Sequence, residues 1–397
     1  MKIKLSFPRF LIVILIASLS QLAFALVDQS LVNSAIDQDL IGFLFDKPIC
    51  FPDLYLIDPG DCVPYGASEN ISELNGMGIS YPIKDLPAAK PDKSLSQMPA
   101  LIAKINLDDN LPAPLYASFD DAISQNNPVR YLEPGHLRYV SYFNRLDYNG
   151  KPYLQLISGE WIRAAPIAYT DFQGLAFAEN PTNDFGWVVD QTPGYSFPSF
   201  NAPLTGKSYY HEDLIQIFNS IDMEGVTWFL INPNEWVNST KARKAHFDPT
   251  PPGGENISRW ISIDLKEQIL YVYENSSLKF ATLIASGLEP FYTQPGGFQI
   301  YSKLPFETMS GAFEADRSDL YYLEDVPWTM YYDNARALHG SYWRTYFGYP
   351  QSHGCVNLSP GDANWLFQWA EEGDWVFVFD PSGNTPTDPD FYGPGAP

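Results

Sequence analysis

Residues 339–357 of this chain read His-Gly-Ser-Tyr-Trp-Arg-Thr-Tyr-Phe-Gly-Tyr-Pro-Gln-Ser-His-Gly-Cys-Val-Asn. The whole sequence of 397 residues holds only five histidines and three cysteines, yet His339, His353 and Cys355 all fall in this stretch. A thiol close to an imidazole can be held as a thiolate, which is a strong nucleophile at neutral pH. The stretch therefore predicts a cysteine nucleophile with a histidine partner.

Small residues flank these three side chains. Gly340 and Gly354 have no Cβ, so backbone N–H groups beside them can approach a reacting carbonyl. Ser352 suits a tight turn that presents the sulfur. The local sequence thus favours acyl-transfer chemistry at Cys355.

The pattern resembles the signature of the L,D-transpeptidase (YkuD-type) family, in which a His and a spacer precede Ser/Thr-His-Gly-Cys-x-Asn/Arg. His339 opens the pattern here, and the run from Ser352 to Asn357 closes it. The resemblance covers about a third of the chain. It implies a mainly β fold with one short helix after the Cys loop, and neither a cofactor nor a metal.

The resemblance also implies roles for individual residues. Cys355 attacks the carbonyl between an L-centre and a D-residue in a peptidoglycan stem tetrapeptide, and the terminal D-Ala leaves. An amine of a second stem then resolves the thioester into a crosslink. His339 takes the thiol proton or holds a thiolate–imidazolium pair, and the Gly340 carbonyl orients its ring. Backbone N–H groups near His353 and Gly354 hold the oxyanion.

Five further assignments follow from the same resemblance. His353 is an alternative base, although we place it in the loop or on the oxyanion side. Asn357 is expected to fix the Cys loop or to contact a substrate carboxylate, and Ser352 to lie at the substrate. A Pro-aromatic-Met stretch lines the donor groove in the family, so Trp328 and Tyr331 are wall candidates; packing in the core is the alternative.

Other interpretations of these residues stay open. Cys355 could be an inert buried thiol, or it could bind zinc with His339 and His353, although a structural zinc site normally has four ligands. A rival enzyme is an exported cell-wall cysteine peptidase or carboxypeptidase that uses water as the acceptor. The other rival is a non-catalytic wall-binding protein. Acylation of Cys355 by a carbapenem, a class that acylates this family, separates the enzymes from the binder.

The composition limits fold class and partners. The 34 prolines and 27 glycines mark many turns between short strands, which favours a mainly β protein. A formal net charge of −23 excludes nucleic acid as a partner and is repelled by an anionic membrane surface. The expected partners are the donor and acceptor stem peptides of peptidoglycan, with wall glycan as a further candidate. We expect a monomer.

Residues 1–25 are typical of an export signal. Three basic residues precede an apolar run, and Ala-Phe-Ala at 23–25 fits the cleavage rule. An uncleaved membrane anchor is the alternative. Cys50 and Cys62 could form a disulfide in an oxidising compartment, which leaves Cys355 as the odd thiol. The chain is therefore expected in the cell envelope, the periplasm or the extracellular wall.

An internal repeat precedes the catalytic stretch. The segment 150–162 aligns with the segment 75 positions later, and a Glu-Trp pair lies near the end of both. A strand, a Gly turn, a second strand and a Glu-Trp turn describe a meander in a small barrel. Two such units, 101–170 and 171–248, resemble bacterial src-homology-3-like modules. Trp161 and Trp236 could stack on sugar or peptide, but packing in the barrel cores is favoured.

The remaining segments complete the domain plan. An irregular, Pro-rich segment is expected at 26–100, the catalytic domain at 256–380 and a disordered tail at 381–397. Alternating apolar residues between 260 and 273 predict the strand pair that opens the catalytic domain. The Ser-Pro-Gly-Asp start at Ser359 predicts the helix that follows the Cys loop.

Overall fold

The computed structural model describes residues 67–252, 254, 257–312, 317 and 320–386. The chain divides into a unit of residues 1–83 and a unit of residues 84–397. The described part of the first unit holds α5 (Ala67–Gly76). The expected export signal and the Cys50–Cys62 pair lie outside the described residues. Within those residues, no helix is both long and apolar enough to cross a membrane.

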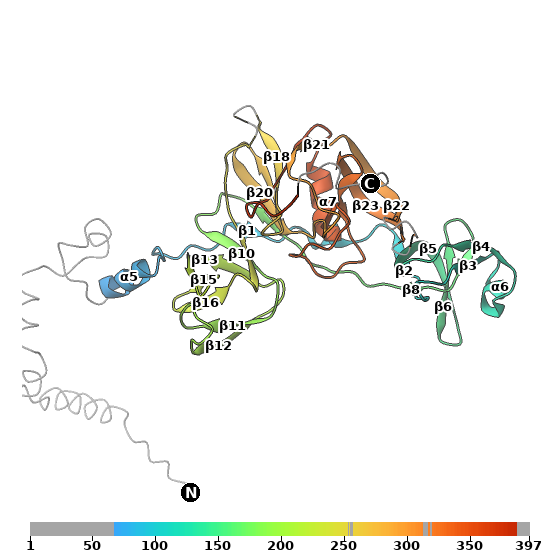
Figure 1. The fold of residues 1–397 in the computed structure, drawn as a ribbon, viewed down its shortest axis with the longest axis horizontal. Helices are drawn as coiled ribbons and strands as arrows, with labels where there is room; N and C mark the ends of the chain where they lie inside the picture. Colours follow the sequence, from blue (N-terminus) through green and yellow to red (C-terminus); the bar gives the residue numbers. More distant parts are fainter. Residues whose placement is uncertain (1–66, 253, 255–256, 313–316, 318–319, 387–397) are drawn as a thin grey trace, which may run out of the picture. The chain divides into compact units, whose positions relative to one another are not determined.

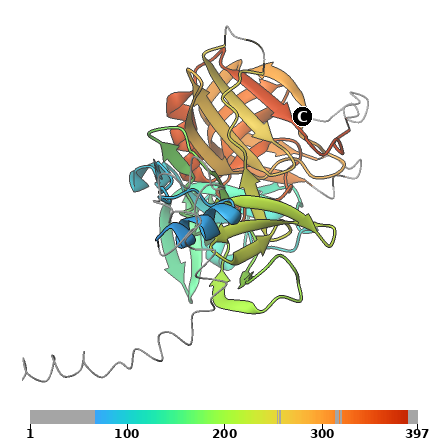
Figure 2. The same ribbon diagram turned by 90° about the vertical axis from the view of Figure 1, so that its left-hand side faces the viewer.

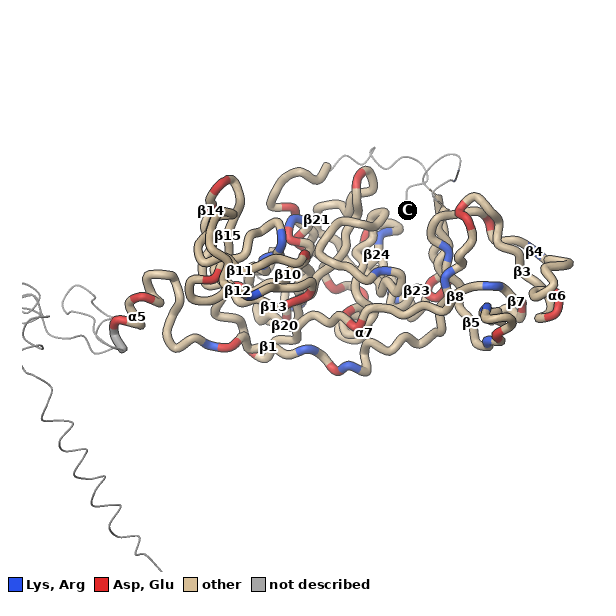
Figure 3. Tube along the Cα trace, turned by 90° about the horizontal axis from the view of Figure 1, so that it is seen from below, with Lys and Arg blue, Asp and Glu red and all other residues tan. Residues whose placement is uncertain are grey.

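The expected mainly β fold is confirmed, with 46% of the described residues in strands and 9% in helices. Figure 1 shows the second unit, whose described residues hold α6 (Phe119–Ser124), α7 (Pro360–Trp369) and the 3-10 helix η1 (Lys93–Ser96). Acidic and basic residues are interspersed along this chain (Figure 3).

A seven-stranded sheet forms one layer of the catalytic domain. Its strands in spatial order are β1 (Ala88–Ala89), β9 (Leu175–Phe177), β20 (Ser277–Leu283), β19 (Ile269–Glu274), β18 (Arg259–Asp264), β26 (Trp375–Phe379) and β21 (Gly296–Gln299). Successive residues of a strand point to opposite faces. Ile261 and Ile263 therefore enter one core cluster, while Trp260 enters a second cluster on the other face.

A second group of strands carries the motif. These strands are β22 (Ser302–Gly311), β23 (Tyr321–Asp333), β24 (Arg336–Gly340) and β25 (Val356–Leu358). Ala363 and Leu366 of α7 lie in the same core cluster as residues of β18. The helix therefore packs against the seven-stranded sheet (Figure 2). The Ser359 side chain accepts a hydrogen bond from the N–H three residues later, at the helix start that the sequence predicts.

The first repeat segment contributes its strands to the same 11-stranded sheet as this group. Its strands are β2 (Leu101–Lys104), β3 (Ala113–Tyr116), β4 (Pro128–Leu132), β5 (Leu137–Tyr148), β6 (Lys151–Leu156), β7 (Trp161–Ile162) and β8 (Ala165–Pro166). Leu115, Val140 and Leu154 are fully buried in its core. β5 pairs in parallel with β23, so Leu137 lies opposite Tyr321. The strands of the repeat are therefore continuous with the strands that carry the motif.

The second repeat segment has two sheets. One contains β13 (Leu214–Ile217), β10 (Asp184–Val188) and β17 (Ala242–Ala245), and the other contains β12 (Leu204–Tyr209), β11 (Thr192–Tyr195), β16 (Glu235–Asn238), β15 (Val226–Asn232) and β14 (Asn219–Met223). Val188, Phe229 and Val237 lie in their shared core. Phe185 and Trp187 of β10 instead pack on the outer face of the seven-stranded sheet, against residues such as Tyr271.

The two repeats share a turn geometry. The φ angles are 51° and 69° at residues 149–150 and 57° and 76° at residues 224–225. Two consecutive positive φ values are those of the hairpin turn whose twist matches its strands. These turns lie 75 positions apart, which is the offset of the repeat in the sequence. The resemblance of the two segments to src-homology-3-like modules stays a prediction. Trp161 is buried among aromatic neighbours of its own module, and Trp236 is half-buried.

Three segments differ from the expected domain plan. The strand β1 from the Pro-rich segment and the strand β9 from the second repeat segment both extend the seven-stranded sheet. The Asp362 carboxylate fixes this edge, because it accepts hydrogen bonds from the Gly174 N–H and the Thr282 hydroxyl. After β26, Asp380 accepts hydrogen bonds from the residues that follow it, so residues 381–386 form a defined turn where disorder was expected.

Candidate active site

Parallel pairing of β24 and β25 brings the two ends of the motif together. His339 lies directly opposite Asn357 in the ladder. Parallel neighbours need a crossover connection of a dozen or more residues. Residues 341–355 supply that connection, which is the physical reason for the long spacer between His339 and Cys355.

Hydroxyl groups hold the loop that carries the sulfur. The Ser352 hydroxyl donates to the Cys355 carbonyl oxygen and accepts from the Gly354 N–H, at 3.1 Å. The Thr293 hydroxyl donates to the Gly354 carbonyl oxygen at 2.8 Å. Gly354 itself has a φ of +116°, and a Cβ there would lie 3.2 Å from Arg336 Nε. This conformation favours glycine, so the residue before Cys355 is fixed by backbone geometry.

A cavity of about 310 Å³ opens beside the loop, and both Cys355 and His339 line it. Cys355 is half-buried, so its sulfur is reachable from this space. The predicted substrate-side residues Ser352, Asn357 and Tyr331 line the same cavity. Its other lining residues are Leu137, Thr308, Met309, Ser310, Tyr321, Leu323, Ala335, Trp343, Arg344 and His353.

Trp328 differs from its expected role as a wall of the substrate groove. Trp328 is 9% exposed in the hydrophobic core and is not among the residues that line the cavity. A Cβ at Gly340 would lie 2.9 Å from the Pro327 side chain and 3.3 Å from the Trp328 ring. Close contact between β23 and β24 therefore accounts for the glycine at 340. Trp328 packs in the core, which was the alternative to a place in the substrate wall.

The two histidines of the motif occupy different environments. His339 is 2% exposed, and its Nδ1 lies 3.3 Å from the Gly340 carbonyl oxygen, which is the contact that the family resemblance implies. His353 is exposed at the cavity, where its ring stacks at 6.0 Å from the Tyr321 ring and lies 5.1 Å from the Phe291 ring. Of the two histidine rings, the surrounding chain therefore fixes the orientation of His339.

Arg344 determines which nitrogen of His339 carries the proton. Its Nε donates to the Asn357 side-chain oxygen. Because arginine can only donate, the amide NH₂ of Asn357 must face His339, and its Nδ2 lies 3.0 Å from His339 Nε2. Nε2 is then the acceptor, and Nδ1–H donates to the Gly340 carbonyl. The ring is therefore held as the tautomer that carries its proton on Nδ1, and the Nε2 lone pair faces Asn357 on the cavity side.

Burial keeps both reacting groups neutral at rest. It lowers the pKa of His339 to about 4, against the opposing effect of the Gly340 carbonyl. Burial also raises the pKa of the Cys355 thiol above its ordinary value, against smaller effects of the Ala337 N–H and the Arg336 charge. The sulfur lies 3.8 Å from the Ala335 carbonyl oxygen, and within the described chain no hydrogen bond joins it to His339. These features favour a neutral thiol and imidazole over an ion pair.

The pH dependence of thiol alkylation tests this resting state. We expect the rate at which iodoacetamide labels Cys355 to rise with pH beyond about 8.5, the ordinary thiol pKa, because a raised pKa leaves little thiolate at neutral pH. Mass spectrometry of the peptide that carries Cys355 gives the labelled fraction at each pH, and the Cys355→Ala chain gives the background. A flat rate between pH 5 and 8 would show a preformed thiolate and contradict the neutral state.

Sequence analysis missed two residues of the site. Thr293 carries no local signal of this role, because its hydrogen bond to the Cys loop joins residues 61 positions apart. Arg344 lies in the spacer of the motif, where nothing local marks it. Its donors reach both Asn357 and Gln351, which makes it the residue that ties the crossover to the histidine.

Replacement of Arg344 is expected to slow acylation of Cys355 roughly tenfold to a hundredfold, because it releases Asn357 and thereby the His339 ring. Both Arg344→Met and Arg344→Lys should show the loss, since lysine keeps the charge but not the planar fork. Imidazole ¹⁵N shifts should change from one tautomer of His339 to a mixture. Arg130→Lys in the first repeat segment serves as the control. An unchanged rate and tautomer in the Arg344 variants would remove this positioning role.

Comparison with protein families finds a match over residues 258–378, to the YkuD model described as the L,D-transpeptidase catalytic domain. Comparison with curated proteins finds no match.

Several solved structures are similar to part of the chain. An L,D-transpeptidase from Stackebrandtia nassauensis is 28% identical, over 34% of this chain and 60% of that chain, with a TM-score of 0.26. The catalytic domain of the L,D-transpeptidase from E. faecium is 28% identical, over 32% of this chain and 100% of that one, with a TM-score of 0.28. An L,D-transpeptidase from Mycobacterium smegmatis is 16% identical, over 52% and 90% of the two chains, with a TM-score of 0.30. The chain thus spans 60% of the first of these proteins.

Proposed function

We propose, on the premise that residues 258–378 form an L,D-transpeptidase catalytic domain, that this chain is an exported enzyme that crosslinks peptidoglycan. Its donor is a stem tetrapeptide, and its acceptor is an amine of a second stem. One observation carries the proposal: Cys355 and His339 line a single cavity of about 310 Å³. A nucleophile and a base that share a solvent-reachable space can act on one substrate carbonyl.

The reaction begins with transfer of the thiol proton to His339 Nε2. This nitrogen is the unprotonated one, and at rest it accepts a hydrogen bond from Asn357. Entry of substrate brings the Cys355 side chain toward it and displaces that bond. Hydrogen bonds of catalytic groups often tighten only in the substrate complex, so the resting separation of thiol and ring is compatible with this step.

Acyl transfer then follows in two halves. The Cys355 sulfur bonds to the carbonyl carbon between the L-centre and D-Ala, and the C–N bond breaks as the imidazolium returns its proton to the leaving D-Ala amine. The acceptor amine attacks the thioester, an amide forms, and the sulfur leaves to regain the proton that the amine loses through His339. Backbone N–H groups of the Cys loop stabilise the oxyanion, and each lost donor costs about 3–4 kcal/mol.

Arg344 suits an anionic substrate. It lines the cavity, and burial lowers its pKa only to about 10, so it stays charged at neutral pH. Its hydrogen-bond partners are the side-chain oxygen of Asn357 and the side-chain and backbone oxygens of Gln351, and no carboxylate pairs with it among the described residues. A stem peptide ends in a carboxylate, which can take up the remaining donors of the guanidinium.

The setting of the reaction is proposed from the sequence. The basic, apolar and Ala-Phe-Ala regions of residues 1–25 support export to the envelope or wall. Two repeat modules before the catalytic domain support attachment to wall glycan. We also expect the chain to act as a monomer.

Mass spectrometry of the products tests the function. The full chain is incubated with disaccharide-tetrapeptide, and we expect joined dimers together with released D-Ala. Tripeptide without dimers would identify a carboxypeptidase that uses water, and cleavage of existing crosslinks would identify a peptidase. Ertapenem, which acylates an E. faecium catalytic domain of known structure, serves as the probe of the thiol. Folded protein with no mass shift on Cys355 would favour a non-catalytic wall binder.

A further inference from the structure

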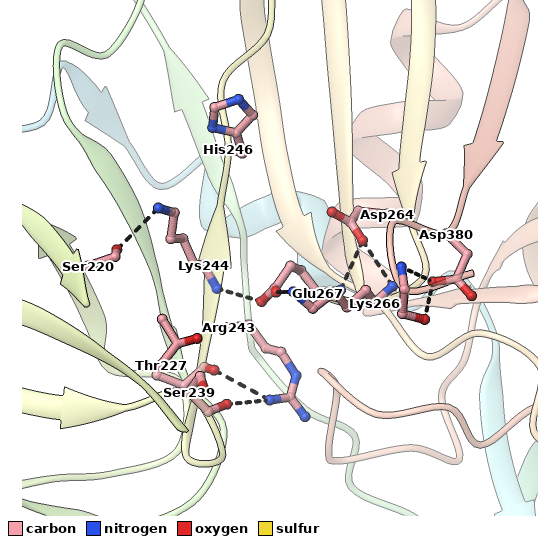
Figure 4. A network of polar contacts seen from close by, with 12 residues as sticks. Ser220, Thr227, Ser239, Arg243, Lys244, His246, Asp264, Lys266, Glu267 and Asp380 are labelled. Carbon is pink, nitrogen blue, oxygen red and sulfur yellow. Dashed lines mark hydrogen bonds and ion pairs between the residues drawn. The ribbon is translucent and has the colours of Figure 1, made fainter. Parts of the chain in front are cut away.

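A second cavity, of about 940 Å³, shares no lining residue with the catalytic cavity. Its floor is the outer face of the seven-stranded sheet, where β18, β19 and β26 lie side by side. Figure 4 shows the facing wall, on which Arg243, Lys244 and His246 follow one another along β17 and the segment after it. The size is within the range of small-molecule sites.

The sheet register fixes what the floor presents. Ser262 lies opposite Tyr271 on one side and opposite Phe377 on the other. Asp264, two residues further along β18, lies on the same face and opposite Phe379. A hydroxyl and a carboxyl therefore sit in a row, flanked by aromatic rings. All five side chains line the cavity.

The charged residues of the wall already have protein partners. Lys244 Nζ lies 2.7 Å from the Asp184 carboxylate. The Arg243 guanidinium donates to the Gly348 carbonyl oxygen at 3.0 Å and covers the Tyr349 ring at 4.9 Å. On the floor side, Lys266 Nζ lies 3.5 Å from Glu267. Because the basic groups of the wall already contact protein groups, they offer little to an anionic ligand.

Two polar groups of the floor belong to largely buried side chains and keep hydrogen-bonding capacity. Asp264 is 5% exposed, and its Oδ1 accepts hydrogen bonds from the N–H groups of Lys266 and Glu267, both at 2.9 Å. No hydrogen bond to Oδ2 exists within the described residues, and Figure 4 shows this oxygen directed away from those contacts. The Ser262 hydroxyl, at 6% exposed, likewise has no partner there. This remaining capacity is open to a ligand in the cavity, where a small number of polar groups can fix the orientation of the ligand.

We propose that this cavity binds a neutral, N-acetylated oligosaccharide. Asp264 Oδ2 accepts from an amide N–H or a hydroxyl of the sugar, and the Ser262 hydroxyl donates to an acetamido oxygen. Phe377 and Phe379 cover the apolar faces of the sugar rings, as aromatic side chains do for amphipathic ligands. The natural source is the glycan strand of the wall, an assignment that rests on the proposed function. The site would hold the strand while its stems react at Cys355.

Calorimetric titration of the full chain with a tetramer of N-acetylglucosamine tests the site. Asp264→Asn keeps Oδ1 and the turn but replaces the free acceptor by a donor, so we expect the affinity to fall at least about tenfold. Phe379→Ala, at the exposed rim of the floor, should also lower the affinity. Asp120→Asn, on the surface of α6, is the matched control and should leave it unchanged. A glucose tetramer without acetamido groups should bind at least about tenfold more weakly.

The outcomes separate this site from the enzyme activity. Ertapenem acylation of Cys355 should proceed at the same rate in Asp264→Asn as in the unaltered chain. Equal binding of the sugar by Asp264→Asn and the unaltered chain, or no binding by either, would overturn the proposed site and leave the transpeptidase proposal standing. Sugar binding without any acylation would sustain the site and remove the enzyme. Equal affinity for the glucose tetramer would refute recognition of the acetamido group.

Discussion

Replacement of Cys355 by alanine is expected to abolish acylation by ertapenem and dimer formation, with losses of more than about a thousandfold. In the proposed mechanism the thioester forms on this sulfur, and among the described residues no other cysteine lies in the cavity. Among the described residues the thiol donates one long hydrogen bond, of 3.8 Å to the Ala335 carbonyl oxygen, so its removal should leave the fold intact. The measurements are the intact mass after exposure to ertapenem and the product spectrum.

A matched variant separates the loss of the nucleophile from a change in the cavity. Ser310→Ala alters the same lining without touching the loop that carries the sulfur, and acylation should stay within a few-fold of the unaltered chain. The melting temperature of Cys355→Ala should also stay close to that of the unaltered chain. A mass shift that persists in folded Cys355→Ala protein would place the nucleophile elsewhere and remove the mechanism.

Replacement of His339 should have the second largest effect, a loss of roughly a hundredfold to ten-thousandfold in acylation rate. The hydrogen-bond network leaves Nε2 of His339 unprotonated, with its lone pair on the cavity side. The His339 pKa of about 4 keeps the ring available as a base down to mildly acidic pH. His339→Ala leaves Asn357 and the Gly340 carbonyl without their partner. His339→Gln preserves polar contacts and is the variant to use if the alanine form unfolds.

The other histidine of the motif is the control. His353 is exposed and stacks on Tyr321, so His353→Ala should reduce acylation by less than about tenfold. Circular dichroism of each variant shows whether the fold persists. If His339→Gln acylates normally and His353→Ala does not, the assignment of the base is wrong, and the exposed ring takes the proton.

Local signals in the sequence predicted the scaffold of the catalytic domain. The alternation between residues 260 and 273 became β18 and β19, because one face of each strand enters the core with α7. The Ser-Pro-Gly-Asp run became the start of α7, because the Ser359 side chain caps the helix through a hydrogen bond three residues away. Interactions of this range depend on near neighbours, so the order of residues is enough to reveal them.

Contacts between distant segments could not be anticipated in the same way. The strand β9 was expected in the second repeat, but it pairs with β20 of the catalytic sheet, about a hundred positions later in the chain. Trp328 was a candidate for the substrate wall, and it lies in the core because β23 packs across Gly340. In both cases the deciding partner is remote in sequence, and composition gives no account of it.

The sequence by itself predicted the candidate reacting groups, because a thiol, two imidazoles and their flanking glycines at fixed spacing indicate a chemistry without coordinates. Only the tertiary structure decided how they are held. The pairing of β24 with β25 sets His339 beside Asn357, and the crossover returns Arg344 to the same place. Hydrogen-bond direction and burial, which select the tautomer and the neutral resting state, are properties of that assembled environment.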